Sequence, residues 1–437
     1  MSYSPLLGSA FNRTKLRDAA HPCTFSGMCS MCTADCVGTC EIGLSAVRGA
    51  DAVYPTTTGD NQVASEKRYP IDYSHFNING RVFGAMGAEA DSDKATIHDV
   101  NLETEIGTLH PVKLKLPIIL PALIKLNWQD YFGGAAMAGV LTVIGEGAVT
   151  KDPTLRLENG KVVHCPKLKE FLDAFRKYYR GYGQIILQVN IDDDRIGVPE
   201  YAIKECGCEA IELIRSVRKR YTACEPSGNT GDALKAQQNG LLVIPDPSDP
   251  QVQERYKAGF GENFRSYGRL PMWDEESLCK RIEELRAIGL KNVYFKMAGY
   301  DPADLERVLR IASMAQVDTV TFDGAGGGSG YSPCKMMNEW CLPTVAMESE
   351  LVQIMSRMEK EGLSLPHIAI TGGFAMEDQV YKALAFGAPY VSAIGICRAS
   401  MAGGNECQKG GENSWKQEIS PQNFSGLVPQ WMNCSRI

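Results

Sequence analysis

The sequence predicts an α/β fold, a (β/α)8 TIM barrel whose eight parallel strands are each followed by a helix. Three observations predict it. Eight short apolar runs recur from residue 116 onward, segments of helical period separate them, and the runs do not alternate with polar residues. Such strands are buried on both faces, as in a parallel sheet that helices cover. The alternative, a doubly wound open sheet, normally carries a glycine-rich turn after its first strand, and LPALIKLN is not one.

The predicted elements follow one another in a regular order. The apolar runs begin near residues 116, 141, 184, 210, 292, 319, 367 and 390. Helix signals between them include the proline in the first turn of VPEYAIKECG, the glycine at its end, and the acidic first turn of DEESLCKRIEELRAIG. Residues 215–269 interrupt the order, and we expect an irregular stretch there because the prolines of LLVIPDPSDP forbid a long regular element.

Composition excludes several classes of protein. The formal charge of −7 and the absence of a basic run argue against binding to nucleic acid or to an anionic membrane. The longest apolar stretch, LPIILPALI, is interrupted by prolines and far shorter than the roughly 20 residues of a membrane span. The first residues, MSYSPLLGSAFNRTK, lack the features of a secretion signal. We therefore expect a cytoplasmic protein.

The carboxyl ends of the strands are where a barrel binds its ligands, with phosphate often after strands seven and eight. The seventh run ends in TGGF, whose Gly372 and Gly373 let backbone N–H groups approach a phosphate before a helix begins, and Arg398 follows the eighth run. Ordinary tight turns are the alternative interpretation. The sixth run ends at Asp323 and continues into GAGGGSGYSP, a glycine run that costs backbone entropy and indicates a ligand beneath it.

Two charged residues at strand ends are candidates for chemistry. Lys296 interrupts the apolar fifth run, VYFKMAG, and either extends to solvent or points its ammonium at the mouth of the barrel. At a flavin, such a charge would stabilise the reduced, anionic ring. The alternative is an ion pair with a carboxylate at a neighbouring strand end. Glu146, in IGEG after the second run, is the candidate partner, or else contacts substrate. His367 opens the seventh run at the opposite end of the barrel, and we expect it to be structural.

These motifs, in this order, resemble the FMN-binding domain of glutamate synthases, in the subgroup of stand-alone glutamate synthase-like proteins. The resemblance covers about residues 70–405 and rests on VIGEG, FKMAG, DGAGGGSGYSPCKMMNEWCLPT, AITGGFAMEDQVYKALAFGAPYV and the insert VIPDPSDPQVQERYKAGFGENFRSYGRL. It implies that the backbone at Pro121, Ala122 and Leu123 lies against the flavin ring and that Lys296 reaches its N1/O2 edge. It also implies that the ribityl phosphate is held by Asp323, Gly326, Gly327, Gly328, Gly372, Gly373 and Arg398. Our candidate catalytic residues are Lys296, Glu146 and Asp323.

The chain departs from the family pattern at two places. After the fourth strand the family has a lysine and a GQGAK segment, whereas this chain has IELIRSVRKRYTACEPSGNTG, in which Arg215 or Lys219 would replace the lysine. The three-cysteine motif that holds a 3Fe–4S cluster after the last strand is also missing, since only Cys397 and Cys407 stand there. No amidotransferase domain precedes the barrel, so we do not expect this chain alone to hydrolyse glutamine.

Five cysteines lie within eighteen residues near the N-terminus: Cys23, Cys29, Cys32, Cys36 and Cys40. Thiolates this close in sequence are able to converge on one centre, and a 4Fe–4S cluster needs four of them. Disulfides do not suit the cytosol, and zinc usually takes two separated pairs, although zinc with His21 stays as an alternative. We assign Cys29, Cys32, Cys36 and Cys40 to a 4Fe–4S cluster, with Cys23 as the spare ligand. The other ten cysteines are scattered singly, as buried free thiols are.

The sequence therefore predicts three segments: a cysteine-rich iron–sulfur segment at residues 1–70, an FMN-binding barrel at 71–405 and a C-terminal tail at 406–437. The predicted function is an oxidoreductase of the class that acts on CH–NH2 donors, passing electrons between a ferredoxin-like carrier and a small amino or 2-oxo acid. One alternative is a transferase or electron-transfer subunit of a larger complex, of the methylamine–glutamate type. The other is a non-redox, phosphate-binding barrel with a zinc site. We also expect a homo-oligomer.

Overall fold

The computed structural model describes part of the chain in detail. The described residues are 71–78, 101–123, 128–150, 152–214, 219–223, 230–238, 242–260, 264–269, 274–325, 341–374, 377–397 and 400. The cysteine-rich segment at residues 1–70 and the tail at 406–437 lie outside them. Segment boundaries at residues 70 and 405 therefore stay predictions.

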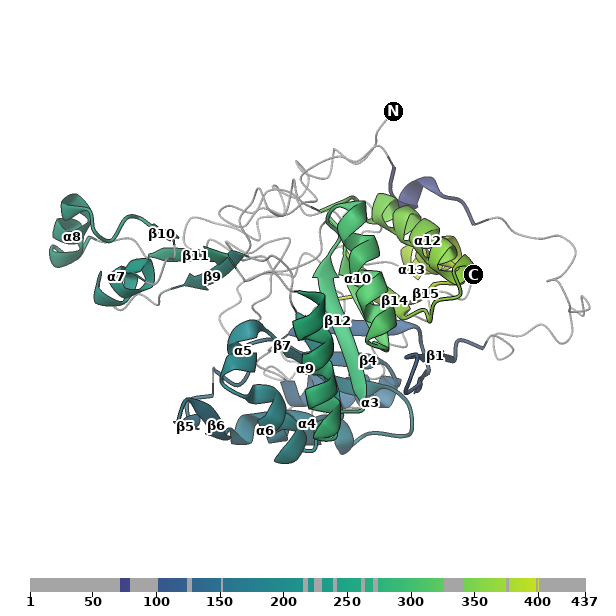
Figure 1. Ribbon diagram of the computed structural model, residues 1–437, viewed down its shortest axis with the longest axis horizontal. Coiled ribbons are helices and arrows are strands. Elements are labelled where there is room, and N and C mark those ends of the chain that lie inside the picture. The colour runs from purple at the N-terminus through teal and green to yellow at the C-terminus, as the bar shows by residue number, and fades with distance from the viewer. Residues whose placement is uncertain are drawn as a thin grey trace, which may run out of the picture.

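Eight parallel strands form a closed barrel, in the order β12-β13-β14-β15-β3-β4-β7-β8 (Figure 1). In chain order they are β3 (Ile118–Leu123), β4 (Leu141–Ile144), β7 (Gln184–Val189), β8 (Ala210–Ile214), β12 (Asn292–Ala298), β13 (Thr319–Asp323), β14 (His367–Thr371) and β15 (Val391–Gly395). The last strand pairs with the first, with Ile394 opposite Ile118. Each strand arises from one of the eight apolar runs, so the predicted barrel is confirmed and the open sheet is excluded.

Helices cover the outside of the barrel, as amphipathic segments between buried strands require. They are α3 (Trp128–Ala138), α4 (Pro166–Arg176), α5 (Ile191–Arg195), α6 (Val198–Lys204), α9 (Glu275–Ala287), α10 (Pro302–Met314), α12 (Thr344–Lys360) and α13 (Glu377–Gly387). Their starts follow the local sequence. The side chain of Asp274 accepts a hydrogen bond from the Ser277 backbone N–H at the start of α9, and Asp301 does the same for Ala303 at the start of α10.

The barrel interior has an apolar floor. Inward-facing residues from β3, β4, β7, β8, β12, β14 and β15 form one buried cluster, namely Ile119, Leu141, Val143, Ile186, Ala210, Tyr294, Ala369 and Ala393. A hairpin of β1 (Thr104–Ile106) and β2 (Val112–Leu114) adds Ile106 and Leu114 to this cluster and so closes the N-terminal end of the barrel. Asp318 anchors the hairpin, because its Oδ1 accepts the backbone N–H groups of Leu109 (2.9 Å) and His110 (2.8 Å). The opposite end, where the strands finish, is the mouth.

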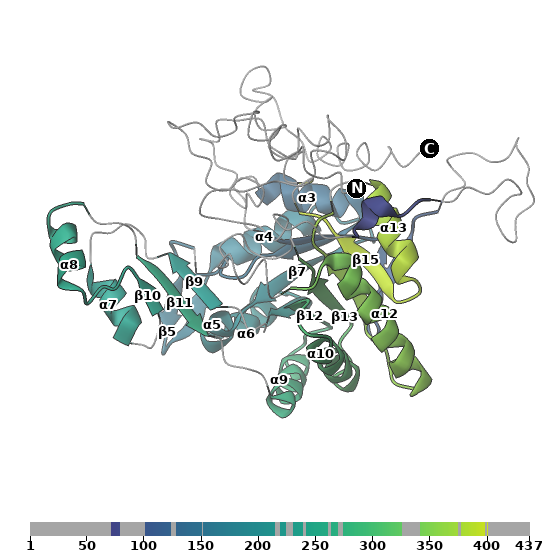
Figure 2. The same cartoon turned by 90° about the horizontal axis from the view of Figure 1, so that it is seen from above.

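The stretch from residue 219 to 269 is not irregular, and that expectation was wrong. It contains β9 (Lys219–Ala223), α7 (Thr230–Gln238), β10 (Leu242–Ile244), α8 (Pro250–Lys257) and β11 (Arg265–Arg269). The strands form a small antiparallel sheet in the order β10-β11-β9, which projects sideways from the barrel in both views (Figures 1 and 2). The prolines only shorten β10, and Ala233, Val243 and Phe264 form a separate small core.

Three scattered cysteines, Cys165, Cys206 and Cys208, are buried free thiols, as the sequence predicts. Burial raises the pKa of Cys165 to about 12 and those of Cys206 and Cys208 to about 11, so all three stay protonated and unreactive at neutral pH. Among the described helices, none combines the length and the hydropathy that crossing a bilayer requires.

Candidate active site

The loops after β12, β13 and β14 are joined by backbone hydrogen bonds at the mouth. Gly299 donates to the carbonyl of Asp323 (2.7 Å), and Gly324 donates to the carbonyl of Thr371 (2.8 Å). Leu342 then donates to Gly299 (2.7 Å), which brings the chain beyond the glycine-rich loop back onto β12. Three strand ends are therefore fixed as one unit, which is the rigid base that a binding site needs.

Lys296 lies inside the barrel at the mouth end of β12. Its neighbours Phe295 and Met297 pack outward against the helices, so Lys296 faces inward, and only 8% of its surface is exposed. Its Nζ lies 3.3 Å from Oδ1 of Asp323 at the end of the adjacent strand β13. The sequence alternative of an ion pair with a neighbouring strand-end carboxylate is confirmed. The partner in that pair is Asp323, whereas Glu146 follows β4, three places away in the barrel order.

Glu212 is a buried carboxyl group that the sequence analysis missed. It faces inward from β8, between the outward-packed Ile211 and Leu213, and is 1% exposed. Gln188 of β7 donates a hydrogen bond from Nε2 to its Oε2. Burial raises the pKa of Glu212 to about 6, against the lowering effect of the Lys296 charge. The signal was present, because a single Glu in the apolar run AIELI is the same kind of interruption as Lys296 in VYFKMAG.

These residues line the upper part of the barrel interior, over more than one layer of side chains. We call this group the polar belt: Gln188, Glu212, Lys296, Thr321, Asp323 and Thr371, all of them buried. Within it Asp323 also accepts a short hydrogen bond from the hydroxyl of Thr371. Because water is excluded, charges in the belt act at low effective dielectric and their interactions are stronger than at a surface.

The mouth end of β3 carries a register irregularity against β4, between Leu120 and Leu123. Pro121 and Ala122, two of the three residues expected to contact a flavin ring, lie within it. Pro121 is buried, and Ala122 packs against the apolar floor. The third, Leu123, ends the strand, and its side chain lies outside the described residues. Shifted pairing at this point leaves backbone groups that do not follow the regular ladder, which is how bulges expose backbone to ligands.

Gly372 and Gly373 follow β14 in the left-handed region, at φ +114° and +87°. A Cβ on Gly372 would lie 2.9 Å from the carbonyl oxygen of Gly324 and 3.0 Å from Oγ1 of Thr344, so only glycine fits. A Cβ on Gly373 would meet nothing within 4 Å, so its backbone borders open space. A phosphate is able to approach backbone of this kind. The helix contribution is weaker than the sequence suggested, because Glu377 and Asp378 stand in the first turn of α13.

The remaining predicted phosphate ligands, Gly326, Gly327, Gly328 and Arg398, lie outside the described residues, as do the five clustered cysteines. Two residues were proposed to replace the family lysine: Lys219 begins β9 of the projecting sheet, and Arg215 lies outside the described residues. His367 opens β14 at the floor end and donates its backbone N–H to Asp318 (3.1 Å), as a structural residue does. Burial lowers the pKa of its ring.

The opposite rim of the mouth is acidic. Glu146 follows β4, and Asp193 lies in α5, directly after β7. Asp193 is 2% exposed, and its Oδ2 accepts the backbone N–H of Gly147 (3.1 Å). Burial raises the pKa of Asp193 to about 6, and the nearby charge of Glu146 raises it further. Sequence reasoning missed Asp193 because the run IDDDR gives no sign of which aspartate is buried.

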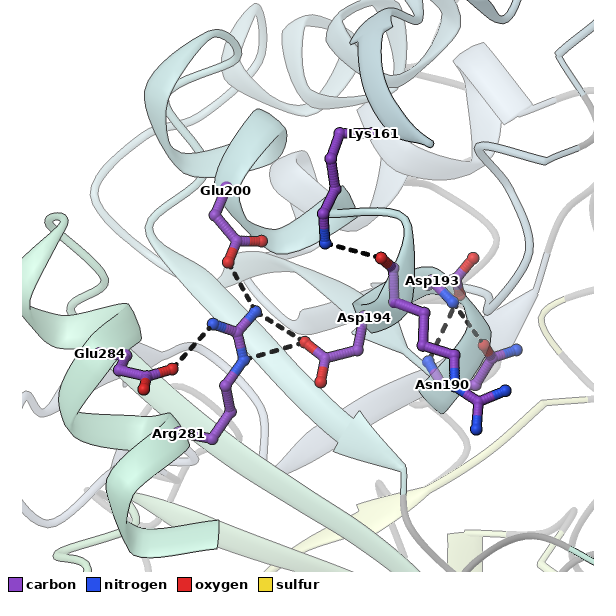
Figure 3. Close-up of polar contacts among 8 residues, drawn as sticks. Lys161, Asn190, Asp193, Asp194, Glu200, Arg281 and Glu284 are labelled. Atoms are coloured by element: carbon purple, nitrogen blue, oxygen red, sulfur yellow. Dashed lines mark hydrogen bonds and ion pairs between the residues drawn. The ribbon is translucent and has the colours of Figure 1, made fainter. Parts of the chain in front are cut away.

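The short helix α5 is held from three sides (Figure 3). At its start, the Asn190 side chain accepts hydrogen bonds from the backbone N–H groups of Asp192 and Asp193. From α9, Arg281 contacts Asp194 of α5 and Glu200 of α6, each at 2.8 Å from Nη2. From the hairpin of β5 (Arg156–Glu158) and β6 (Lys161–His164), the ammonium of Lys161 donates to the carbonyl of Arg195, also in α5, at 2.7 Å. These contacts fix the acidic rim in place.

Residues 269–409 match the family model described as a conserved region in glutamate synthase. This part of the chain is similar to the glutamate synthase conserved region. The matched part begins at the last residue of β11 and contains the four strands β12 to β15, with Lys296, Asp323, Gly372 and Gly373. Glu146, Glu212 and the β3 residues precede it.

A search of the curated proteins found no match. Among solved structures, a mandelate oxidase variant with 2-hydroxy-phenylacetamide is 17% identical, over 77% of this chain and 76% of that one, with a TM-score of 0.44. A flavocytochrome b2 variant with sulfite bound is 12% identical, over 77% and 68%, at 0.45. A FabK variant from Thermotoga maritima is 12% identical, over 65% and 61%, at 0.36.

Proposed function

We propose that this protein is an FMN- and iron–sulfur-dependent oxidoreductase of the glutamate synthase type. In this proposal it passes electrons between a ferredoxin-like carrier and a small amino or 2-oxo acid. The observation that carries the proposal is the buried Lys296 at the mouth, in the same glutamate synthase region as the glycine backbone of Gly372 and Gly373. The ammonium of Lys296 suits the electron-rich edge of a flavin ring, and the glycine backbone suits its phosphate.

The described residues fit FMN. Gly373 borders open space, Gly372 is a position that a side chain would block, and the irregular end of β3 supplies backbone beside the apolar floor. Gly372, Gly373 and Arg398 would hold the phosphate, Pro121 and Ala122 would lie against the ring, and Lys296 would stand at its N1/O2 edge. When bound, FMN supplies transfer of one electron or of a hydride.

The protein's own residues then have separate tasks at the mouth. Lys296 places a positive charge where negative charge develops, and Asp323, with Thr371, fixes the direction of its ammonium. The acidic rim of Glu146 and Asp193 suits the amino group of an amino-acid-type substrate, because carboxylates stabilise ammonium. The apolar floor excludes water from below.

The position of residues 71–78 supports the iron–sulfur part of the proposal. The hydroxyl of Tyr73 donates to Oε2 of the buried Glu348 in α12 (2.6 Å), and the Tyr73 ring lies 5.1 Å from that of Phe374. Phe76 stacks on Phe386 of α13 at 5.4 Å. Phe374 directly follows Gly372 and Gly373, so the chain that continues from the cysteine-rich segment is fixed beside the proposed phosphate loop. We propose that a cluster on that segment exchanges electrons with FMN.

The experiment is anaerobic purification of the full chain, followed by an absorbance spectrum and determination of flavin, iron and zinc. We expect flavin bands with a broad iron–sulfur shoulder, one FMN and about four iron atoms per chain. Replacing Cys32 and Cys36 by Ser should remove the iron and leave the flavin. A colourless protein, or zinc in place of iron, would favour the phosphate-binding barrel with a zinc site.

Turnover tests the substrate. The full chain is supplied with reduced ferredoxin, 2-oxoglutarate and either ammonia or glutamine, and glutamate is measured. The projecting sheet of β9, β10 and β11 favours one other function, that of an electron-transfer subunit in a larger complex, because it offers a surface apart from the barrel. Flavin and iron without turnover would favour that function. The homo-oligomer and the cytoplasmic location stay predictions.

A further inference from the structure

We propose that Glu212 is a proton-holding positioning residue of this site. Its protonation decides whether Lys296 is shared between two carboxylates or is available to an anionic group at the mouth. The inference rests on the proposed function only for the identity of that group.

The polar belt holds more acidic groups than basic ones. Among the described residues it contains one cation, Lys296, and two carboxyl groups, Glu212 and Asp323, exposed by 8%, 1% and 1%. With both carboxyls ionised, the belt would carry a net negative charge in the interior. An uncompensated buried charge is costly, and a buried group usually responds by changing its protonation state. One proton in the belt removes the excess charge.

The contacts of the two carboxyl groups indicate which of them holds that proton. Asp323 has the direct ion pair with Lys296 and a hydrogen bond from Thr371. Glu212 has the neutral amide of Gln188 as its hydrogen-bond donor. The positive charge is therefore committed to Asp323, and the proton belongs to Glu212. The pKa of Glu212, raised to about 6, agrees with this division.

Glu212 lies deeper in the barrel than Lys296. Strand pairing places Glu212 opposite Tyr294 of β12, whereas Lys296 is two residues further toward the mouth. Both side chains point inward, so Glu212 lies one layer below Lys296 and does not reach a ligand at the mouth. It acts through Lys296. The other groups that influence it are Asp323, whose charge raises the pKa of Glu212, and Thr321, whose hydrogen bond lowers it, both from β13. Tyr294 also faces Glu212, and burial, with the charges of Asp318 and Glu212, raises the pKa of its phenol well above the ordinary value.

The consequence is a coupling between a proton and an anion. With Glu212 protonated, the belt is neutral and Lys296 accepts negative charge at the mouth. With Glu212 ionised, the belt repels that charge. By linkage, an anion at the mouth favours protonation of Glu212 to the same degree that protonation favours the anion.

An infrared pH titration of the full chain as purified tests the proposal without requiring flavin. Because Asp193 also has a pKa of about 6, we expect a protonated-carboxyl band of two components that disappears as the pH rises through about 6. One component is lost in Glu212→Gln, and both are retained in Glu209→Gln, which removes an exposed carboxylate just before β8. Gln188→Met should move the midpoint of the Glu212 component to higher pH, because the Gln188 hydrogen bond lowers the pKa of Glu212. Identical titrations of the wild type and Glu212→Gln would overturn the proposal.

The reduction potential of bound flavin provides a second readout. Glu212→Gln should shift the potential upward at pH 8, where wild-type Glu212 is ionised, and leave it unchanged at pH 5. An equal shift at both pH values would indicate a structural role and contradict the proposal. If the chain holds no flavin, the proposed function fails, and the infrared titration still decides the role of Glu212.

Discussion

Lys296 is the only cation in the polar belt among the described residues, and its removal would leave Asp323 buried without its ion pair. Breaking a buried pair from one side typically costs about 3–5 kcal/mol, more than the net contribution of the pair itself. Replacing Lys296 is therefore expected to affect both cofactor binding and stability, and a test of its role has to separate the two effects.

We predict that Lys296→Met lowers the free energy of unfolding by about 3 kcal/mol or more. The double variant Lys296→Met with Asp323→Asn should recover most of that loss, because the side chain at position 323 is then neutral and Glu212, without the Lys296 charge that lowers its pKa, holds its proton. Both variants should bind FMN at least about tenfold more weakly than the wild type, measured by flavin fluorescence. Normal FMN affinity in the stable double variant would show that Lys296 does not contact the cofactor.

Glu348 predicts a pH effect outside the site. It is fully buried in α12, and burial raises its pKa to about 8 against an ordinary value of 4.5. Because the folded pKa is above the unfolded one, the stability contributed by the protonated group is present below about pH 4.5. It is lost as the pH rises toward 8, with a total on the order of a few kcal/mol.

Glu348→Gln should therefore be more stable than the wild type in urea unfolding at pH 9 and nearly equal to it at pH 4.5. Tyr73→Phe removes the hydrogen bond to Glu348 and should cost about 1 kcal/mol. If the wild type and Glu348→Gln show the same pH dependence, Glu348 is not a buried acid.

At the scale of elements, the turns before and after β14 depend on glycine to different degrees. Gly372 combines a left-handed backbone with a collision at 2.9 Å, whereas Gly362, at φ +76°, has only the left-handed backbone and open space. Gly372→Ala should therefore lower the melting temperature more than Gly362→Ala, whose cost we expect to be about 1 kcal/mol. Equal melting temperatures would mean that the loops after β13 and β14 are not in contact.

The contacts around α5 make a second prediction at this scale. Arg281 is 18% exposed and joins α9 to Asp194, which is 16% exposed, and to Glu200 (Figure 3). Arg281→Met should cost about 1–3 kcal/mol and raise the KM for the substrate, because the acidic rim loses its support. Glu284→Gln is the control, since this partner is 51% exposed, and we expect it to change little. An unchanged KM in Arg281→Met would separate α5 from the site.

The order of the strands was readable from the sequence because each barrel strand is buried on both faces and so appears as an unbroken apolar run. The strands of the projecting sheet were not readable from the sequence in this way. β9 reads KRYTA and β11 reads RSYGR, which are too polar to indicate a strand, and their pairing joins residues more than forty positions apart. Glu212 shows a different limit: its sequence signal equalled that of Lys296, but only the strand register brings the two together.

At the scale of the whole molecule, the barrel brings together residues from distant parts of the chain. Five different strands, or the loops that follow them, supply Glu146, Glu212, Lys296, Asp323 and Gly372. Residues 71–78 then fix the chain from the cysteine-rich segment beside the last of these loops. Residues 71–78 and the proposed phosphate loop therefore lie side by side.

The most direct test is an experimental structure of the anaerobically purified protein. We predict density for a flavin at the mouth, with its ring beside Lys296 and Ala122 and its phosphate at Gly372 and Gly373. A flavin bound elsewhere, or a mouth filled by the protein's own side chains, would contradict it.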